Sequence, residues 1–487
     1  MLKNGFYNLL ASVIRITVTI LTVPIIIRLL GVERYGLFTL ASTIVSIATL
    51  AEAGLSMSTT VFISRDLATG NYKGISQTFV IVLSAMVLVS VLISLSILLL
   101  SPIVLTYFNT VSAEHQKILI ESLYFGAITV GFKLLQQVFI GVEQAYQRYD
   151  WINIVSTLQI LFTYVGMWIL ASRENNIIDL MKWQSTCTLV GFFVHGYLGY
   201  SLVHPVLKLY EWSSTIAMNI FEFSLSTWIG SLAGTMFNQF DKIIIASIFS
   251  PNILGIYSAI TSVISQINQL SATAIQPFLP ALSHTINLPE TSIDDLELIV
   301  RKILAANCVI AFGMGGTLLT LSAFWLPMII PSLEIIKVLS SCQILIIIYS
   351  FYSINAVGYY LLIGSGNVRL CTTFQLLAST ITLLLLFIGA KSFGFIGGVS
   401  GNAGYLLTLG MIMFGFRKLG IEWWKAVRAL YPFCIWMLLV ISANLIIGVQ
   451  YDKLIMLFVL QTIVLLGIIF RMKEFRPLFL KFQKVSI

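Results

Sequence analysis

The sequence predicts an all-α polytopic membrane protein with about fourteen transmembrane helices. Two compositional observations lead to this fold class: 58% of the 487 residues are hydrophobic, and only 10% are charged. A soluble domain usually has about 25% charged residues, so this chain lacks the polar side chains that a water-exposed surface requires. The third observation is a series of apolar segments, each long enough to cross the hydrocarbon as a helix of about 20 residues.

The apolar segments are separated by short polar loops. They are too long, and too uniformly apolar, for the alternating strands of a membrane barrel. The first segment lacks a small-residue cleavage site, so we expect it to remain in the protein. In chain order, the fourteen predicted spans are 5–27, 37–62, 77–107, 118–141, 152–171, 183–203, 222–249, 252–282, 301–330, 335–363, 369–390, 394–416, 428–449 and 452–470.

Basic residues predict the orientation of these spans. With the N-terminus placed inside, the inner loops and tails collect about 17 Lys and Arg residues and the outer loops about 8, which is the bias of cytoplasmic loops. Because the span count is even, both termini are expected in the cytoplasm. The net charge of +8 therefore serves membrane topology, and we do not expect nucleic-acid binding.

A short motif occurs twice. PIIIRLLGVERYGLFTLAST begins at Pro24, and DKIIIASIFSPNILGIYSAITS begins at Asp241. Both copies pass from an Ile triplet to a glycine, an aromatic residue and small hydroxyl residues. Six spans separate them, so both insert with the same orientation, which predicts two bundles related by a parallel pseudo-two-fold with a site between them. The alternative is a chance resemblance between short apolar strings.

Polar residues form stripes on the spans that carry this repeat. A step of three or four residues keeps them on one helical face. Such faces avoid lipid tails, so they predict either a shared hydrophilic cavity or hydrogen bonds between packed helices. The first span carries Asn8, Ser12, Arg15, Thr19 and Thr22, and the seventh carries Thr227, Ser231, Gly234, Asn238 and Asp241.

Two basic residues are predicted inside the membrane. Arg15 lies near the middle of the first span, where an arginine costs about 2.5 kcal/mol or more unless water, a carboxylate or an anionic ligand offsets its charge. Lys133 lies midway along the fourth span beside Gln136 and Gln137. A lysine can also extend its ammonium group to the membrane surface, which is the alternative for Lys133.

Two acidic residues are also predicted in the membrane spans. Glu52, in the second span, is a candidate to neutralise Arg15, relay a proton or bind a cation. Asp241 and Lys242 lie near the outer end of the seventh span, where they either act in the cavity or cap the helix. Because the fixed charges of the expected cavity are mainly cationic, we expect an anionic substrate such as a phosphate or pyrophosphate group.

Other residue patterns exclude several function classes. The sequence has no G-x-x-x-x-G-K-[ST] phosphate loop, no H-E-x-x-H and no G-x-S-x-G, so an enzyme is not expected. The five cysteines and four histidines are dispersed, so neither a metal site nor a cofactor is expected. His195 is interpreted as a hydrogen-bonded core residue, and Glu143 is placed on an inner loop.

Several motifs resemble those of one transporter family. P-x-x-x-R-x-L-G-x-x-x-Y-G occurs at residues 24–36, an acid precedes Gly-Leu at Glu52, and I-[AS]-R occurs at 63–65. The second half opens with Asp241, followed by L-G-x-Y from Leu254. These motifs resemble the polysaccharide transporters of the multidrug/oligosaccharidyl-lipid/polysaccharide exporter superfamily, whose bacterial members include the O-antigen flippases. Glu52 stands where this family often has Asp.

The resemblance implies two six-helix lobes, at 1–210 and 211–418, and two additional helices with a basic cytoplasmic tail at 419–487. It implies a flippase of the bacterial inner (plasma) membrane. By alternating access, such a protein moves undecaprenyl-pyrophosphate-linked oligosaccharide repeat units, of O-antigen or a related surface polysaccharide, from the cytoplasmic to the outer leaflet.

The resemblance also suggests roles for the residues singled out above. The candidate substrate contacts are Arg15, Lys133, Asn238 and Lys242. Glu52 and Asp241 are candidates for a coupling ion, proton or sodium, or for a structural ion pair. The expected partners are the lipid-linked oligosaccharide, membrane lipid, the coupling cation, a polysaccharide polymerase and a chain-length regulator. The alternatives are a cation-coupled multidrug exporter of the same superfamily and a non-transporting scaffold for polysaccharide assembly.

Overall fold

The structure, a computed structural model, is helical in nearly all described residues, and these contain no strand. It describes residues 2–106, 108, 111–173, 176–276, 293–330 and 335–471. Within these ranges, the description leaves out the side chains of residues 2–13, 16, 104, 105, 226, 229–231, 233, 237, 238, 295, 335–337, 423, 425–427 and 429. The basic tail after Arg471, which supports the predicted orientation, lies outside the described residues.

The described chain forms two compact units, residues 1–259 and 260–487. Helix α10 begins in the first unit and continues into the second. The first unit contains α1 (Leu2–Leu30), α2 (Val32–Ala48), η1 (Thr49–Glu52), α3 (Leu55–Thr69), α4 (Tyr72–Leu105), α5 (Ala113–Ala145), α6 (Tyr149–Arg173), α7 (Ile177–Val203), η2 (His204–Leu209), α8 (Ser214–Thr235), the π-helical η3 (Met236–Phe240), α9 (Asp241–Ile248) and the start of α10 (Pro251–Ile275).

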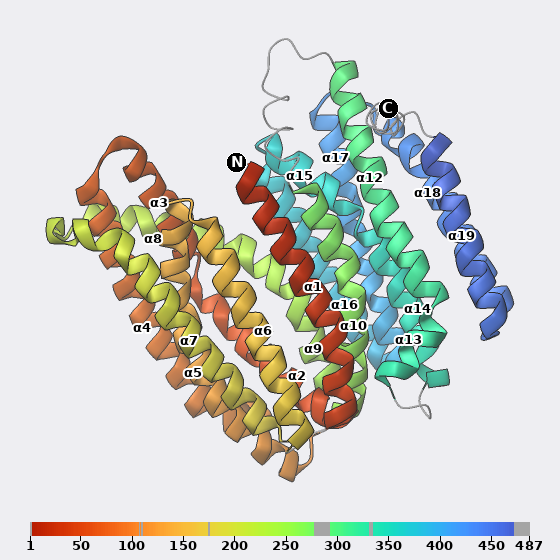
Figure 1. Cartoon of the computed structure of the whole chain (residues 1–487), viewed down its shortest axis with the longest axis horizontal. Helices are drawn as coiled ribbons and strands as arrows, with labels where there is room; N and C mark the ends of the chain where they lie inside the picture. The colour runs from red at the N-terminus through yellow and green to blue at the C-terminus, as the bar shows by residue number, and fades with distance from the viewer. Residues whose placement is uncertain are drawn as a thin grey trace, which may run out of the picture. The chain divides into compact units, whose positions relative to one another are not determined.

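The second unit contains the rest of α10 and the helices that follow it (Figure 1). They are α12 (Ile293–Thr320), α13 (Ser322–Ile329), α14 (Ile335–Tyr352), α15 (Asn355–Gly364), α16 (Val368–Ser400), η5 (Gly401–Leu409), α17 (Gly410–Lys418), α18 (Trp423–Ile447) and α19 (Tyr451–Arg471).

The predicted fold class is confirmed. One described helix, or two or three consecutive helical elements, lies at each of the fourteen predicted segments. Ten described helices are long and apolar enough to cross a membrane by length and composition. The boundary of the compact units, at 259/260, differs from the predicted lobe boundary at 210/211. The predicted division into two lobes and two additional helices stays a prediction, as does the pseudo-two-fold between lobes.

The second predicted span is broken in the middle. The segment 37–62 is one apolar span by sequence, but Ala53 and Gly54 both have left-handed backbone conformations, with φ of 50° and 77°. A Cβ atom on Gly54 would lie 2.1 Å from Thr227 Oγ1 and 2.5 Å from the carbonyl oxygen of Ser224. Glycine is therefore required both for the turn and for the close approach of α8.

The repeated motif forms a contact with itself. A Cβ atom on Gly36 would lie 1.9 Å from the carbonyl oxygen of Pro251, and one on Gly255 would lie 2.1 Å from that of Val32. Each glycine thus lies against the first residue of the helix that contains the other glycine. A reciprocal contact of this kind is what a two-fold relation between two copies produces.

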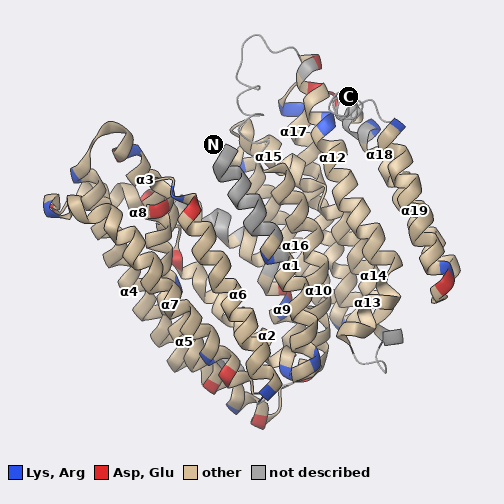
Figure 2. Ribbon diagram, in the orientation of Figure 1, with Lys and Arg blue, Asp and Glu red and all other residues tan. Residues whose placement is uncertain are grey.

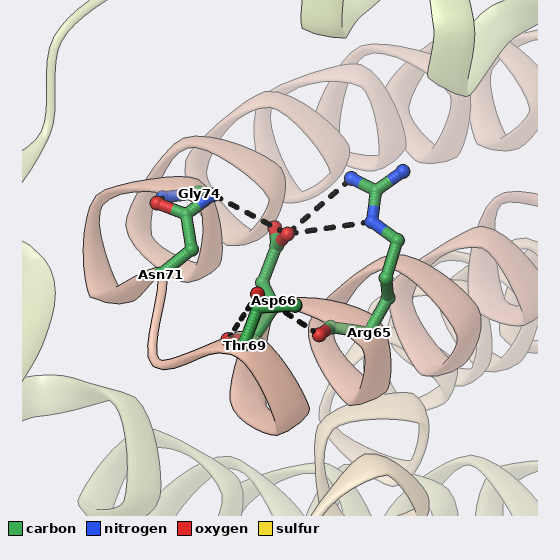
Figure 3. Close-up of polar contacts among 5 residues, drawn as sticks. All are labelled: Arg65, Asp66, Thr69, Asn71 and Gly74. Atoms are coloured by element: carbon green, nitrogen blue, oxygen red, sulfur yellow. Dashed lines mark hydrogen bonds and ion pairs between the residues drawn. The ribbon is translucent and has the colours of Figure 1, made fainter.

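Charged residues lie mainly at the ends of the helices (Figure 2). One such end is the turn from α3 to α4, where Asp66 is 3% exposed (Figure 3). Its carbonyl oxygen accepts a hydrogen bond from the Asn71 backbone N–H at 2.8 Å, and its Oδ1 is 3.3 Å from Arg65 Nη2. The arginine of the I-[AS]-R motif thus pairs with the acid that follows it.

Candidate functional site

A cavity of about 540 Å³ lies among helices α2, α5, α6 and α7 of the first unit. This volume is within the range of about 300–1,000 Å³ that is common for ligand-binding pockets. Helices α5 and α7 run side by side, and each also packs against α2 and α6 (Figure 1). The cavity therefore belongs to one compact unit.

The wall of the cavity is rich in amides and hydroxyls. Its described polar residues are Ser42 on α2, Thr129, Lys133, Gln136 and Gln137 on α5, Ser156, Gln159, Thr163 and Tyr164 on α6, and Gln184 and Thr188 on α7. Apolar side chains such as Phe38 and Ile160 complete it. Amide and hydroxyl groups both donate and accept hydrogen bonds, so this wall is suited to a ligand with many hydroxyl groups.

Some of these amides hold one another in place. Gln136 Nε2 donates to Gln159 Oε1 at 3.0 Å, and Gln159 Nε2 donates to the carbonyl oxygen of Cys187 at 3.3 Å. In contrast, Gln184 Oε1 is buried and has no hydrogen-bond partner among the described residues. A buried acceptor without a donor is unfavourable, so this amide oxygen is the least well satisfied polar group described in the wall.

Lys133 supplies the charge among the described residues of the wall. Glu52 lies close enough to Lys133 for a favourable electrostatic interaction. Glu52 ends η1, and its Oε1 accepts a hydrogen bond from the Ser56 backbone N–H at 3.2 Å, in the first turn of α3. A carboxylate is stabilised at a helix N-terminus. The break in the second span thus brings Glu52 and Lys133, two of the predicted site residues, near each other.

The structure does not bring every candidate to this cavity. Arg15, Glu52, Asp241 and Lys242 are not among the described residues of its wall. Arg15 is half-buried on α1, where its carbonyl oxygen accepts a hydrogen bond from Thr19 Oγ1 at 2.9 Å. Asn238 lies in η3, and its side chain, like those of Asn8, Ser12 and Ser231, lies outside the described residues.

Asp241 forms hydrogen bonds within its own part of the chain. It begins α9 and is 3% exposed. Its Oδ2 accepts a hydrogen bond from the hydroxyl of the buried Tyr257 at 2.7 Å, and its Oδ1 accepts one from the Lys242 N–H at 2.8 Å. Lys242 Nζ lies 3.3 Å from Gln239 Oε1. Both carboxylate oxygens of Asp241 thus accept hydrogen bonds, and the bond from Tyr257 joins α9 to α10.

A buried pair of titratable side chains lies outside the cavity wall. His195 Nδ1 lies 2.9 Å from Glu143 Oε1 and 3.0 Å from Oε2, and both side chains are 0% exposed. The interpretation of His195 as a hydrogen-bonded core residue is confirmed. The placement of Glu143 on a loop is wrong, because α5 continues to Ala145 and buries this side chain.

Several cavity residues were missed in the sequence. Ser156, Gln159 and Thr163 follow one another at steps of three and four on α6, and Gln184 and Thr188 do so on α7. The same helical spacing that reveals the stripe around Arg15 would have found them. The predicted stripes lie on the spans that carry the repeat, whereas the cavity lies mostly on the fourth to sixth spans.

Comparison with known proteins identifies the family. The family described as Polysaccharide biosynthesis protein matches residues 1–286, which is more than half of the chain. This chain belongs to that family. A relative described as a putative O-antigen transporter, from Shigella flexneri, is 21% identical over 324 residues, which cover 64% of this chain and 74% of that protein. The family membership expected from the motifs is confirmed.

Solved structures show the same fold. The inward closed conformation of the lipid II flippase MurJ is similar over 97% of this chain and 99% of its own, with a TM-score of 0.70 at 11% identity. An inward-facing multidrug resistance transporter of the MATE family, from the MOP superfamily, is similar over 84% and 98%, with a TM-score of 0.69 at 13% identity. These relatives are transporters, which agrees with the expectation that the chain is not an enzyme.

Proposed function

We propose that this protein is a flippase that moves polyprenyl-pyrophosphate-linked oligosaccharide repeat units, of O-antigen or a related surface polysaccharide, from the inner to the outer leaflet of a bacterial inner membrane. The observation that carries the proposal is the cavity of the first unit. It combines one lysine with amide and hydroxyl groups, in a chain that belongs to a polysaccharide biosynthesis family. The name of the Shigella relative and the flippase fold support it.

The chemistry of the cavity matches the two parts of such a headgroup. A sugar presents hydroxyl groups, which pair with amides and hydroxyls such as Gln137, Tyr164 and Gln184. A pyrophosphate is anionic, and the Lys133 ammonium group offers it charge-assisted hydrogen bonds. The headgroup would occupy the cavity while the polyprenyl chain remains in lipid. Arg15, Asn238 and Lys242 are proposed as further substrate contacts in other conformations of the alternating-access cycle.

Glu52 is proposed to link the substrate to a coupling ion. While Lys133 has no anionic ligand, Glu52 balances its charge. When a pyrophosphate pairs with Lys133, the Glu52 carboxylate is free to take up a proton or sodium ion. For Asp241 we propose the structural role, because both of its oxygens already accept hydrogen bonds. A polymerase and a chain-length regulator are proposed as partners downstream of transport.

Reconstituted transport tests this function. Purified protein is placed in vesicles that contain a polyprenyl-pyrophosphate-linked oligosaccharide, and its appearance in the outer leaflet is measured with a lectin. We expect Lys133→Ala to weaken substrate binding about ten- to a hundredfold, because a hydrogen bond to a charged group contributes about 1.5–3 kcal/mol. Lys182→Ala, on an exposed lysine of α7, is the matched control and should transport like the wild type.

The same vesicles separate the alternatives. A multidrug exporter would move cationic dyes and leave the lipid-linked sugar in place. A scaffold would move neither, and it would still assemble with its partners after Lys133→Ala. Transport of the lipid-linked sugar that is insensitive to Lys133→Ala would remove this cavity from the proposal.

A further inference from the structure

An apolar groove of about 380 Å³ lies between α6 and α7, next to the polar cavity. Both helices are long and apolar enough to span a membrane. Large side chains at the groove are well exposed: Leu158 is 46% exposed, Phe162 62% and Val190 56%. On a membrane span, exposed apolar residues of this kind are suited to contact with hydrocarbon.

The groove and the cavity share one wall residue, Gln159. Its amide crosses between the two helices and lies against Gly191, where a Cβ atom would be 2.6 Å from Gln159 Cδ and Oε1. On the cavity side, Gln159 Oε1 accepts a hydrogen bond from Gln136. One flexible side chain, packed against a glycine, therefore lines both the polar cavity and the apolar groove.

We propose that the α6–α7 groove binds the hydrocarbon chain of a lipid whose polar headgroup occupies the cavity, with Gln159 positioned between the two parts. This inference rests on the proposed function, since it identifies where the chain of the transported lipid lies. An amphiphile requires a polar site and an apolar site that adjoin, and these two sites adjoin at Gln159. The chain would leave the cavity past Gly191, where the absence of a side chain lets Gln159 move aside.

Because the groove adjoins the cavity at Gln159, the lipid expected in the groove is the one whose headgroup is in the cavity. A phospholipid that merely surrounds the protein has no reason to prefer the groove to any other exposed apolar surface. A lipid held by its headgroup in the cavity has its chain tethered beside the groove, which raises the local concentration of the chain there. Preference for the groove should therefore depend on the headgroup contacts, Lys133 among them.

Photocrosslinking tests the proposal. A benzophenone amino acid is introduced at Val190, in the groove, or at Tyr197, which is 77% exposed on the same helix and is not part of the groove. Each protein is reconstituted in vesicles of phosphatidylethanolamine and phosphatidylglycerol that contain a polyprenyl-pyrophosphate-linked oligosaccharide. After irradiation, the mass of the attached lipid is determined. We expect polyprenyl adducts several-fold enriched at position 190 over position 197, and Lys133→Ala should abolish the enrichment.

Phospholipid adducts at both positions, in the proportions of the bilayer, would overturn the proposal. Transport by the same vesicles is measured in parallel, so the two hypotheses fail separately. Transport without enrichment at position 190 removes the groove and leaves the flippase function. Enrichment without transport keeps the groove and removes the flippase function. As a second variant, Val190→Trp fills the groove and should raise the substrate concentration needed for half-maximal transport several-fold, whereas Tyr197→Trp should not.

Discussion

The two compact units bury different kinds of polar groups. The first unit buries charged side chains, among them Asp66, Glu143 and Asp241, each at most 3% exposed. In the described part of the second unit the buried polar residues are neutral, such as Asn307, Asn355 and Gln461, except for Glu297 near the start of α12. A buried charge is costly unless it is paired and hydrogen-bonded, whereas a neutral amide is satisfied more easily. Charge is thus concentrated in the unit that contains the polar cavity.

The helix breaks of the two units also differ in whether a charged or a neutral side chain completes them. The break between α2 and α3 is stabilised by the Glu52 carboxylate, which accepts the Ser56 N–H. The break between α14 and α15 is stabilised by a neutral amide, because Asn307 Nδ2 donates to the carbonyl oxygens of Ser353 at 3.1 Å and Ile354 at 3.4 Å. A helix break therefore does not require a charged side chain, and the two units complete their breaks with different chemistry.

Removing one member of the buried His195–Glu143 pair gives the largest expected effect. His195→Phe leaves the fully buried Glu143 carboxylate without the imidazole that contacts it, and we expect it to lower the free energy of unfolding by about 3–5 kcal/mol. The midpoint of unfolding in detergent can be followed through the reactivity of the buried cysteines, such as Cys308 and Cys342.

The double variant Glu143→Leu/His195→Phe provides the control. It removes both polar groups, so it should recover a large part of the stability that His195→Phe loses. His195→Asn, which keeps a donor, covers the case in which His195→Phe does not fold. Equal losses in the single and double variants would show that packing, and not the charge of Glu143, sets the stability at this site.

Removing a neutral buried amide should have an intermediate effect. Asn307→Leu leaves the carbonyl oxygens of Ser353 and Ile354 without this donor, and we expect a loss of about 1–3 kcal/mol in the free energy of unfolding. The same unfolding assay measures it. The substrate concentration for half-maximal transport should not change, because Asn307 lies in the second unit and is not part of the cavity wall.

Ser341→Ala is the matched control for Asn307→Leu. Ser341 is fully buried in the same unit, but its Oγ has no hydrogen-bond partner among the described residues, so its removal should be nearly neutral. If Asn307→Leu were as harmless as Ser341→Ala, the amide would not stabilise the break between α14 and α15.

An exposed ion pair should have the smallest effect. Lys73 Nζ pairs with Glu211 Oε2 at the surface of the first unit, where the two side chains are 51% and 71% exposed. We expect Lys73→Ala to change stability by about 0–1 kcal/mol, because water screens exposed charges. A double-mutant cycle with Glu211→Ala, measured at low and high salt, isolates the pair. A larger coupling energy that persists at high salt would contradict this view of the surface.

Much of the fold follows from the sequence because hydrophobic length alone locates membrane helices. The spans around Lys133 and His195 needed only a count of apolar residues. The break at Ala53 was not predicted, because an alanine adopts a left-handed conformation only where its surroundings impose it. Here those surroundings include Trp228 of α8, whose Nε1 donates to the carbonyl oxygen of Leu50 at 2.7 Å. Such contacts are distant in sequence and leave no local pattern.

The candidate site was predicted less completely. Lys133 and its two neighbouring glutamines were found because a charge inside an apolar segment is conspicuous. Gln159 was missed because the polar residues of its span were not examined for helical spacing, although Ser156 and Thr163 lie on the same face. Its importance comes from Gly191 on the next helix, and no spacing rule connects these two positions.

The crossing of Gly36 and Gly255 has a consequence for the origin of the chain. Each copy of the repeated motif supplies one glycine and one carbonyl oxygen to the reciprocal contact. A half-length protein carrying one copy would form this reciprocal contact with a second molecule of itself. Duplication and fusion of its gene would then convert a homodimer into a single polypeptide without creating any new contact at these two glycines.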